Sequence, residues 1–143
     1  MRAIHTKALA CLSILTLSAA TAAYATPCTN ATLNGAYGVQ EEGQFPGGGF
    51  SQFRAVGELI FDGKGGGTRV TTNWYSDFEV VSDGPRQITY SVSADCRYTL
   101  TYSDSLETFA GVIVNGGAKL LYIETSGDPS RSGQAERIRS SNQ

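Results

Sequence analysis

The sequence predicts one all-β domain, a single antiparallel up-and-down barrel of about eight strands. After residue 25, short runs of apolar or β-branched residues recur along the chain, and no segment has the period of an amphipathic helix. Glycine-rich turn sequences separate these runs. Closure into a barrel leaves no exposed strand edge, so we favour it over the alternative, a β-sandwich.

The first 25 residues have the layout of a secretory signal peptide. The basic residues Arg2 and Lys7 precede an apolar stretch over residues 8–20, which is too short to span a bilayer. The Ala-Tyr-Ala sequence at 23–25 offers a cleavage site, and the pattern of a lipid-anchoring site is absent. We therefore expect an exported protein, periplasmic or extracellular, without a membrane anchor, whose residues 26–143 form one domain.

Histidine content and charge exclude several function classes. The only histidine, His5, lies in the predicted signal. The mature chain therefore lacks the imidazole that Ser-His-Asp catalysis, Cys-His catalysis and histidine-ligated zinc sites require. Two of the 11 basic residues, Arg2 and Lys7, also lie there, whereas all 13 acidic residues follow it. The acidic balance argues against nucleic acid or an anionic membrane as a partner, and we expect no metal and no cofactor.

Two cysteines remain after the predicted cleavage, because Cys11 lies in the signal. In an oxidising compartment, Cys28 and Cys96 are most simply a disulfide, since the CxxC spacing of redox or metal pairs is absent. The bridge would tie the mature amino terminus to the middle of the domain. In the chain-entropy model it would stabilise the fold by about 4 kcal/mol.

Alternation of polar and apolar residues predicts the strands. It is clearest over 86–93 and 95–103, where each strand has one polar and one apolar face. Residues 109–114 and 120–123 are apolar on both faces, which predicts cover by the barrel interior and by a second layer or subunit. The predicted strands, in order, are 35–41, 53–62, 67–75, 78–82, 86–93, 95–103, 107–115, 118–126 and 133–139.

Glycine-containing segments predict the connections between these strands. Residues 62–67, 83–85 and 115–117 supply positions tolerant of positive φ and predict hairpin turns. The segment 43–49 contains a proline and three consecutive glycines, which predicts a loop. The polar carboxy-terminal residues 140–143 are expected to fray.

Two carboxylates on apolar strand faces are the candidate catalytic groups. Glu58 shares a face with Val56 and Ile60, and Glu124 continues the face of Tyr122. Either the register turns these carboxylates outward, or they lie inside the barrel with a raised pKa and a partner. The predicted partners and ligand-binding residues are Arg54, Arg97, Arg137, Trp74, Tyr90 and Tyr122.

Four turn and strand motifs are spread over nearly all of the mature chain. They are LNGAY at 33–37, GELIFDGKG at 57–65, YSVSADC at 90–96 and SGQAER at 132–137. With these motifs the chain resembles a widespread group of small secreted bacterial proteins of unknown function. That group is more distantly similar to the calycin-like barrels of allene oxide cyclase and the dirigent proteins. The resemblance implies an eight-stranded barrel, trimers, and a hydrophobic lumen that shapes a reactive intermediate without a cofactor.

No catalytic residue of those enzymes matches a position in this chain, so the activity is not carried over with the fold. Our first hypothesis is a non-enzymatic exported barrel that binds a small apolar molecule in its lumen or a protein partner on its outer wall. The second is a cofactor-free cyclase or isomerase that uses Glu58 or Glu124 as a polarising group. The third is a structural surface protein that self-associates, as a dimer or trimer, through its apolar outer face.

Overall fold

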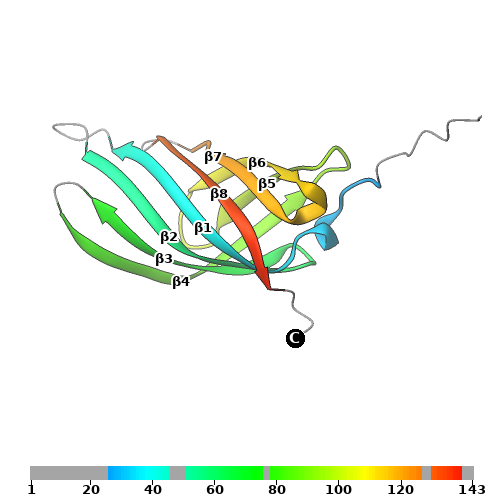
Figure 1. The fold of residues 1–143 in the computed structure, drawn as a ribbon, viewed down its shortest axis with the longest axis horizontal. Helices are drawn as coiled ribbons and strands as arrows, with labels where there is room; N and C mark the ends of the chain where they lie inside the picture. Colours follow the sequence, from blue (N-terminus) through cyan, green and yellow to red (C-terminus); the bar gives the residue numbers. More distant parts are fainter. Residues whose placement is uncertain (1–25, 46–50, 76–77, 127–129, 140–143) are drawn as a thin grey trace, which may run out of the picture.

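A computed structural model describes residues 26–45, 51–75, 78–126 and 130–139. Its strands form one antiparallel sheet in the order β1 to β8, and β8 pairs with β1 to close a barrel (Figure 1). The predicted barrel is confirmed, and the β-sandwich alternative is wrong. The strands are β1 (Asn34–Phe45), β2 (Ser51–Asp62), β3 (Gly66–Tyr75), β4 (Phe78–Val92), β5 (Arg97–Tyr102), β6 (Thr108–Val114), β7 (Lys119–Glu124) and β8 (Ser130–Arg139), with short 3-10 helices η1 (Asn30–Thr32) and η2 (Asn115–Gly117).

The predicted turn at 83–85 is wrong, because these residues lie within the single strand β4. The pairing register between β3 and β4 shifts between Arg69 and Thr71, opposite this segment, as in a β-bulge. Gly84 has a φ of +124°, and a Cβ there would lie 2.7 Å from the carbonyl oxygen of Arg69. The bulge therefore requires glycine at this position, and the Gly-Pro pair bends one strand instead of joining two.

The other predicted turns are confirmed where the structure describes them. Between β2 and β3, the Asp62 carboxylate accepts hydrogen bonds from the backbone N–H groups of residues 64, 65 and 66 at 2.7, 3.0 and 2.9 Å. These bonds lower the pKa of Asp62. The helix η2 joins β6 to β7. The predicted loop at 43–49 begins later, since β1 continues to Phe45, and its remainder lies outside the described residues, as do the predicted signal and residues 140–143.

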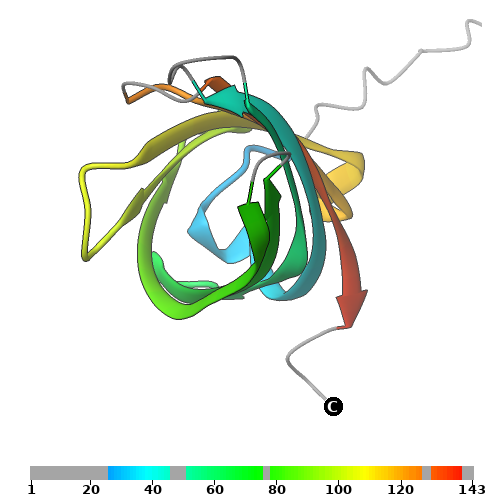
Figure 2. The same ribbon diagram turned by 90° about the vertical axis from the view of Figure 1, so that its left-hand side faces the viewer.

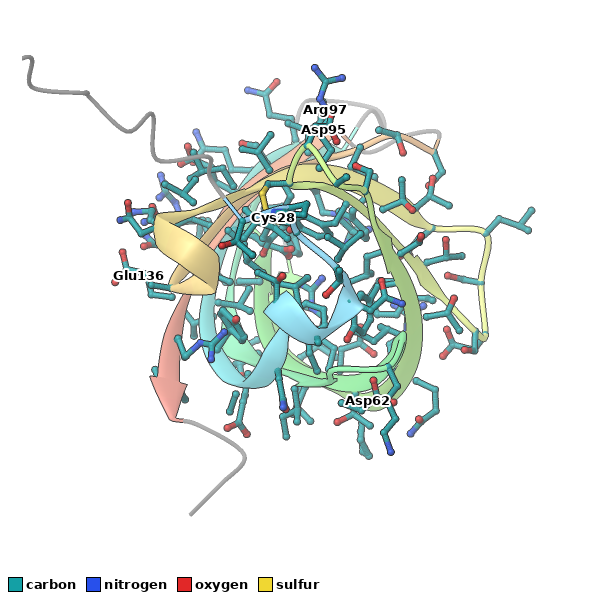
Figure 3. The ribbon with its side chains drawn as sticks, turned by 90° about the vertical axis from the view of Figure 1, so that its right-hand side faces the viewer. Cys28, Asp62, Asp95, Arg97 and Glu136 are labelled. Carbon is teal, nitrogen blue, oxygen red and sulfur yellow. A yellow bond between two sulfur atoms is a disulfide. The ribbon has the colours of Figure 1, made fainter. Side chains whose placement is uncertain are left out.

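One end of the barrel interior is apolar, and η1 lies across it (Figure 3). The Phe61 ring packs edge-on against Tyr37 and Tyr90, with ring centroids 5.4 and 4.8 Å apart. The Tyr90 hydroxyl donates to the carbonyl oxygen of Leu33 at 2.9 Å, which fixes η1 to the strands. The buried core cluster comprises Leu33, Tyr37, Val39, Leu59, Phe61, Ile88, Tyr90, Tyr98, Leu100, Tyr102, Phe109, Ile113, Leu120, Tyr122 and Ala135.

The predicted disulfide is confirmed. Cys28, which precedes η1, is bonded to Cys96 in the turn between β4 and β5, and their Cα atoms are 5.0 Å apart. Figure 3 shows Cys28 beneath the turn that carries Asp95 and Arg97. The bridge therefore holds the start of the domain against the apolar end of the barrel. Within the described residues, no helix is long and apolar enough to cross a membrane.

Candidate functional site

The predicted inward orientation of the Glu58 face is wrong. Val56 and Ile60, which share this face, are 60% and 39% exposed, whereas Leu59 and Phe61 on the opposite face are buried. Both faces of β2 carry large apolar residues, so alternation alone does not reveal which face turns inward. A shift of one residue moves every side chain of a strand to the other face, and Glu58 therefore lies on the outer wall.

Three of the predicted ligand-binding residues also lie on the outer wall. Trp74 is exposed. Arg54 and Arg97 are exposed and each faces a neighbouring carboxylate, Glu42 at 3.8 Å and Asp95 at 3.3 Å. Arg54 of β2 lies directly opposite Trp74 of β3 on this wall, whereas Arg97 lies at the start of β5.

Arg137 and Tyr90 act at the apolar end of the barrel. The Arg137 guanidinium donates to the Tyr37 hydroxyl at 2.6 Å and to the carbonyl oxygens of Gly117 and Thr32 at 3.1 and 3.0 Å. It joins the end of β8 to both 3-10 helices. Tyr90 likewise bonds to backbone oxygens near η1. Both residues hold the end of the fold together, and neither approaches the predicted carboxylates.

Of the two alternatives for Glu124, the structure has the inward one, and its partner is none of the predicted arginines. Its side chain is 1% exposed and lies on the inward face of β7 with buried Tyr122. The partner is Arg131, whose Nε lies 2.7 Å from the carboxylate and whose other guanidinium nitrogen lies 3.0 Å from Glu107. Burial lowers the pKa of Arg131, but the bond to Glu124 and the charge of Glu107 outweigh it and raise the pKa.

Ion pairs continue around this polar end of the barrel. The Arg86 guanidinium lies 2.7 Å from Asp104 and 3.2 Å from Glu107, and its carbon lies 3.6 Å from the centroid of the Tyr102 ring. Glu107 thus connects Arg86 with Arg131. This network ties the segment between β5 and β6 to β4 and β8, and it gives the polar end a fixed arrangement of charges.

A buried polar layer lies next to this end, and the sequence analysis missed it. Glu41 and Arg69 form an ion pair with side-chain exposures of 0% and 5%. One oxygen of Glu41, the Nε of Arg69 and the hydroxyl of Tyr122 have no hydrogen-bond partner among the described residues. A cavity of about 10 Å³ lies beside them, roughly the space of one water molecule. It is lined by Leu59, Arg69, Tyr98, Leu100, Phe109 and Tyr122.

Gly133 makes room for this layer. A Cβ at this position would lie 2.7 Å from side-chain carbons of both Glu41 and Tyr122. Burial raises the pKa of the Tyr122 hydroxyl, and the nearby Glu41 carboxylate raises it further. A sequence signal for Glu41 existed, since it continues the face of Tyr37 and Val39 as Glu124 continues that of Tyr122.

A hollow lies at the polar end of the barrel and is lined by residues of β1, β2, β7 and β8. Figure 2 shows how these strands are arranged at this end. We call the hollow the rim pocket, and its volume is about 460 Å³. Buried Arg131 and Glu124 lie at its base, and exposed Glu42 and Arg54 lie at its outer side. The lining residues are Glu42, Gly43, Gln44, Gln52, Phe53, Arg54, Ile123, Glu124, Arg131 and Ser132.

Within the described residues, no three His, Cys, Asp or Glu side chains are grouped so that they could hold a metal ion. No family model matches the chain, and no curated protein or solved structure is significantly similar to it. The resemblance to the allene oxide cyclase and dirigent barrels therefore stays a prediction. The features that bear on function are the geometry of the rim pocket and the exposed side chains of the outer wall.

Proposed function

We propose that this protein is an exported, non-enzymatic binding protein that takes a small polar ligand in the rim pocket. The observation that carries the proposal is the pocket of about 460 Å³ built over the buried Arg131–Glu124 pair. Small-molecule sites have volumes of about 300–1,000 Å³ and contain a few polar groups held in place. The charged groups of Arg131 and Glu124 hold each other in position, so they are polar groups of this kind. The signal-like leader and the disulfide support export.

A small apolar ligand in the lumen has less support than a polar ligand at the rim. The inward side chains of the core cluster pack against each other, and the cavity beside Arg69 has room for about one water molecule. The rim pocket instead presents carboxylates, guanidinium groups and amides. An apolar ligand would bury those groups without hydrogen-bond partners, which is costly.

The cyclase or isomerase alternative keeps one supporting observation, since Glu124 is buried and lines the rim pocket. Its carboxylate is bonded to Arg131 at 2.7 Å, so its charge is compensated before any substrate arrives. Glu58, the other candidate, lies on the outer wall, where water competes for every interaction. Binding therefore explains the pocket better than catalysis does.

Self-association through the outer wall is a second candidate function. Val112 of β6 lies opposite Leu121 of β7, and both are exposed. Ile123 continues the same outer face and is also exposed. This contiguous apolar stripe is the surface that the sequence analysis assigned to a second layer or subunit. Sedimentation of the purified protein at several concentrations tests this candidate, and a monomer at all of them would contradict it.

The rim proposal is tested by blocking the pocket. Ser132→Trp would fill the rim pocket, whereas Thr99→Trp would fill a groove of about 310 Å³ over β5 and β6 and serves as the matched control. Neutral sugars, carboxylic acids, polyamines and amino acids are tested singly by thermal shift and calorimetry. We expect at least one compound to bind the wild type and Thr99→Trp but not Ser132→Trp. Equal binding by all three proteins, or binding by none, would contradict the proposal.

A further inference from the structure

We infer that the ligand of the rim pocket is a neutral, linear oligosaccharide, an inference that rests on the rim pocket being the ligand site. Three features carry it. The first is the balance of charge in the pocket, the second is the set of amide side chains that border it, and the third is a groove that continues it along the outer face of β8. Each feature restricts the chemistry of the ligand in a different way.

The rim pocket contains equal numbers of acidic and basic side chains. Glu42 faces Arg54 at 3.8 Å, and Glu124 is bonded to Arg131 at 2.7 Å. Sites for anionic ligands present arginines whose bonding capacity is open to the ligand, whereas Arg131 is held between Glu124 and Glu107. A cation would in turn meet two guanidinium groups. The buried Glu124–Arg131 pair would be costly to separate, whereas the Glu42–Arg54 pair is exposed. With its charges balanced, the pocket favours an uncharged ligand.

One cross-strand pair of glutamines lines the rim pocket, and a second pair lines the groove that continues it. Gln44 of β1 lies opposite Gln52 of β2, and Gln40 of β1 lies opposite Gln134 of β8. A primary amide carries no charge, accepts hydrogen bonds through its oxygen and donates two through its nitrogen. A hydroxyl also both donates and accepts. Rows of amides therefore match a ligand with many hydroxyl groups.

A groove of about 330 Å³ continues the rim pocket along β8. It shares Glu42 and Ser132 with the rim pocket, and its lining includes the small Ser132 side chain and the adjacent Gly133. Leu121 in the groove and Ile123 in the rim pocket, both on β7, give an apolar wall for the C–H faces of sugar rings. We call this the β8 groove, and its lining residues are Gln40, Glu42, Leu121, Ser132, Gly133 and Gln134.

The length of the combined site selects a chain over a compact molecule. The rim pocket and the β8 groove are joined over Ser132, and the two Gln pairs lie along the same stretch of β1. A single sugar would contact only one part of this surface. Several linked sugars would contact both parts and gain hydrogen bonds from each, so affinity should rise with chain length.

The experiment is a calorimetric titration of the full mature protein with probes of matched length. The neutral probes are maltohexaose, cellohexaose and N-acetylchitohexaose; the charged probes are hexagalacturonate and the glucosamine hexamer, and the monosaccharide of each serves as the short probe. We expect one neutral hexamer to bind at least about tenfold more tightly than its monosaccharide and than either charged hexamer.

Amide variants locate the binding. Gln44→Ala and Gln134→Ala should each weaken the neutral hexamer about fivefold, since one hydrogen bond contributes about 1 kcal/mol. The matched control Gln87→Ala removes an exposed glutamine on β4 outside both the rim pocket and the β8 groove, and should leave the affinity unchanged.

The outcomes separate this inference from the proposed function. If a charged or short probe binds more tightly than every neutral hexamer and Ser132→Trp abolishes that binding, the oligosaccharide inference is overturned and the rim remains the site. If a neutral hexamer binds equally well to Ser132→Trp, both are overturned. If none of the neutral hexamers binds, the oligosaccharide inference is also overturned.

Discussion

The substitution Gly133→Ala should destabilise the barrel, because Gly133 leaves the space that Glu41 and Tyr122 occupy. The added Cβ would lie 2.7 Å from Cγ of Glu41, 2.7 Å from Cζ of Tyr122 and 2.8 Å from the backbone oxygen of Gln40. These separations are shorter than carbon atoms tolerate. At least one side chain must therefore move, and the backbone of β1 limits how far the new methyl group itself can shift.

The size of the effect follows from three contributions, of which two are unfavourable and one is favourable. Overpacking a core costs about 1–3 kcal/mol, and loss of one partner of a buried ion pair costs about 3–5 kcal/mol. Displacing Glu41 only weakens its bond to Arg69, so part of the second cost applies. Against this, alanine reduces the entropy of the unfolded chain, which returns about 0.4–1 kcal/mol. We expect a net loss of about 2–3 kcal/mol in the free energy of unfolding.

The assay is urea denaturation at neutral pH with the disulfide intact, followed by circular dichroism. Gly38→Ala on β1 is the matched control, because its Cβ would meet Cγ2 of Ile138 at 3.3 Å, where a small adjustment suffices. The control should change the free energy of unfolding by less than about 0.5 kcal/mol. Equal denaturation midpoints for the two variants would refute the packing argument.

Three further predictions concern stability. Arg69→Met leaves Glu41 buried without its partner and should cost about 3–5 kcal/mol in urea denaturation, whereas adding Glu41→Leu should recover at least half of this loss. Replacing Cys28 and Cys96 by serine should lower the free energy of unfolding by about 4 kcal/mol, since the bridge spans a separation of 68 residues; a loss under about 1 kcal/mol would contradict the chain-entropy account. Burial raises the pKa of Tyr90 from 10.0 to about 12. Because the folded state holds this proton more tightly, its contribution to stability is complete below pH 10 and is lost as the pH rises to 12. Between pH 10 and pH 12, the thermal midpoint of Tyr90→Phe should fall less steeply with pH than that of the wild type. Identical slopes for the two proteins would count against a raised pKa of Tyr90.

The two ends of the barrel interior differ in composition. At one end the barrel interior is filled by aromatic and aliphatic side chains beneath η1, and at the other it is bordered by the ion pairs of Arg86 and Arg131. Apolar packing supplies stability without specific geometry, whereas paired charges hold their partners at defined positions. The apolar end therefore contributes non-directional packing, whereas the polar end presents charged groups at defined positions.

Some features could be predicted from residues close together in sequence. The Asp62 turn is local, since one carboxylate accepts three backbone N–H groups within four residues. Alternating faces over β4 and β5 predict half-buried strands, because side chains on a strand alternate between its two sides. Cys28 and Cys96 were the only pair available after the predicted cleavage. The all-β class, most of the turns and the disulfide could therefore be predicted from the local sequence and the cysteine count.

The placement of the functional groups depended on the closed sheet. Val56 and Ile60 are as apolar as Leu59 and Phe61, so only the curvature and register of the barrel decide which pair is buried and on which side Glu58 lies. Arg131 reaches Glu124 because β8 runs beside β7. The sequence by itself determined the class of fold and its disulfide, since these follow from local periodicity and composition. Only the tertiary structure decided the partners of the buried charges, because ion pairs across a barrel depend on a strand register that no single strand encodes.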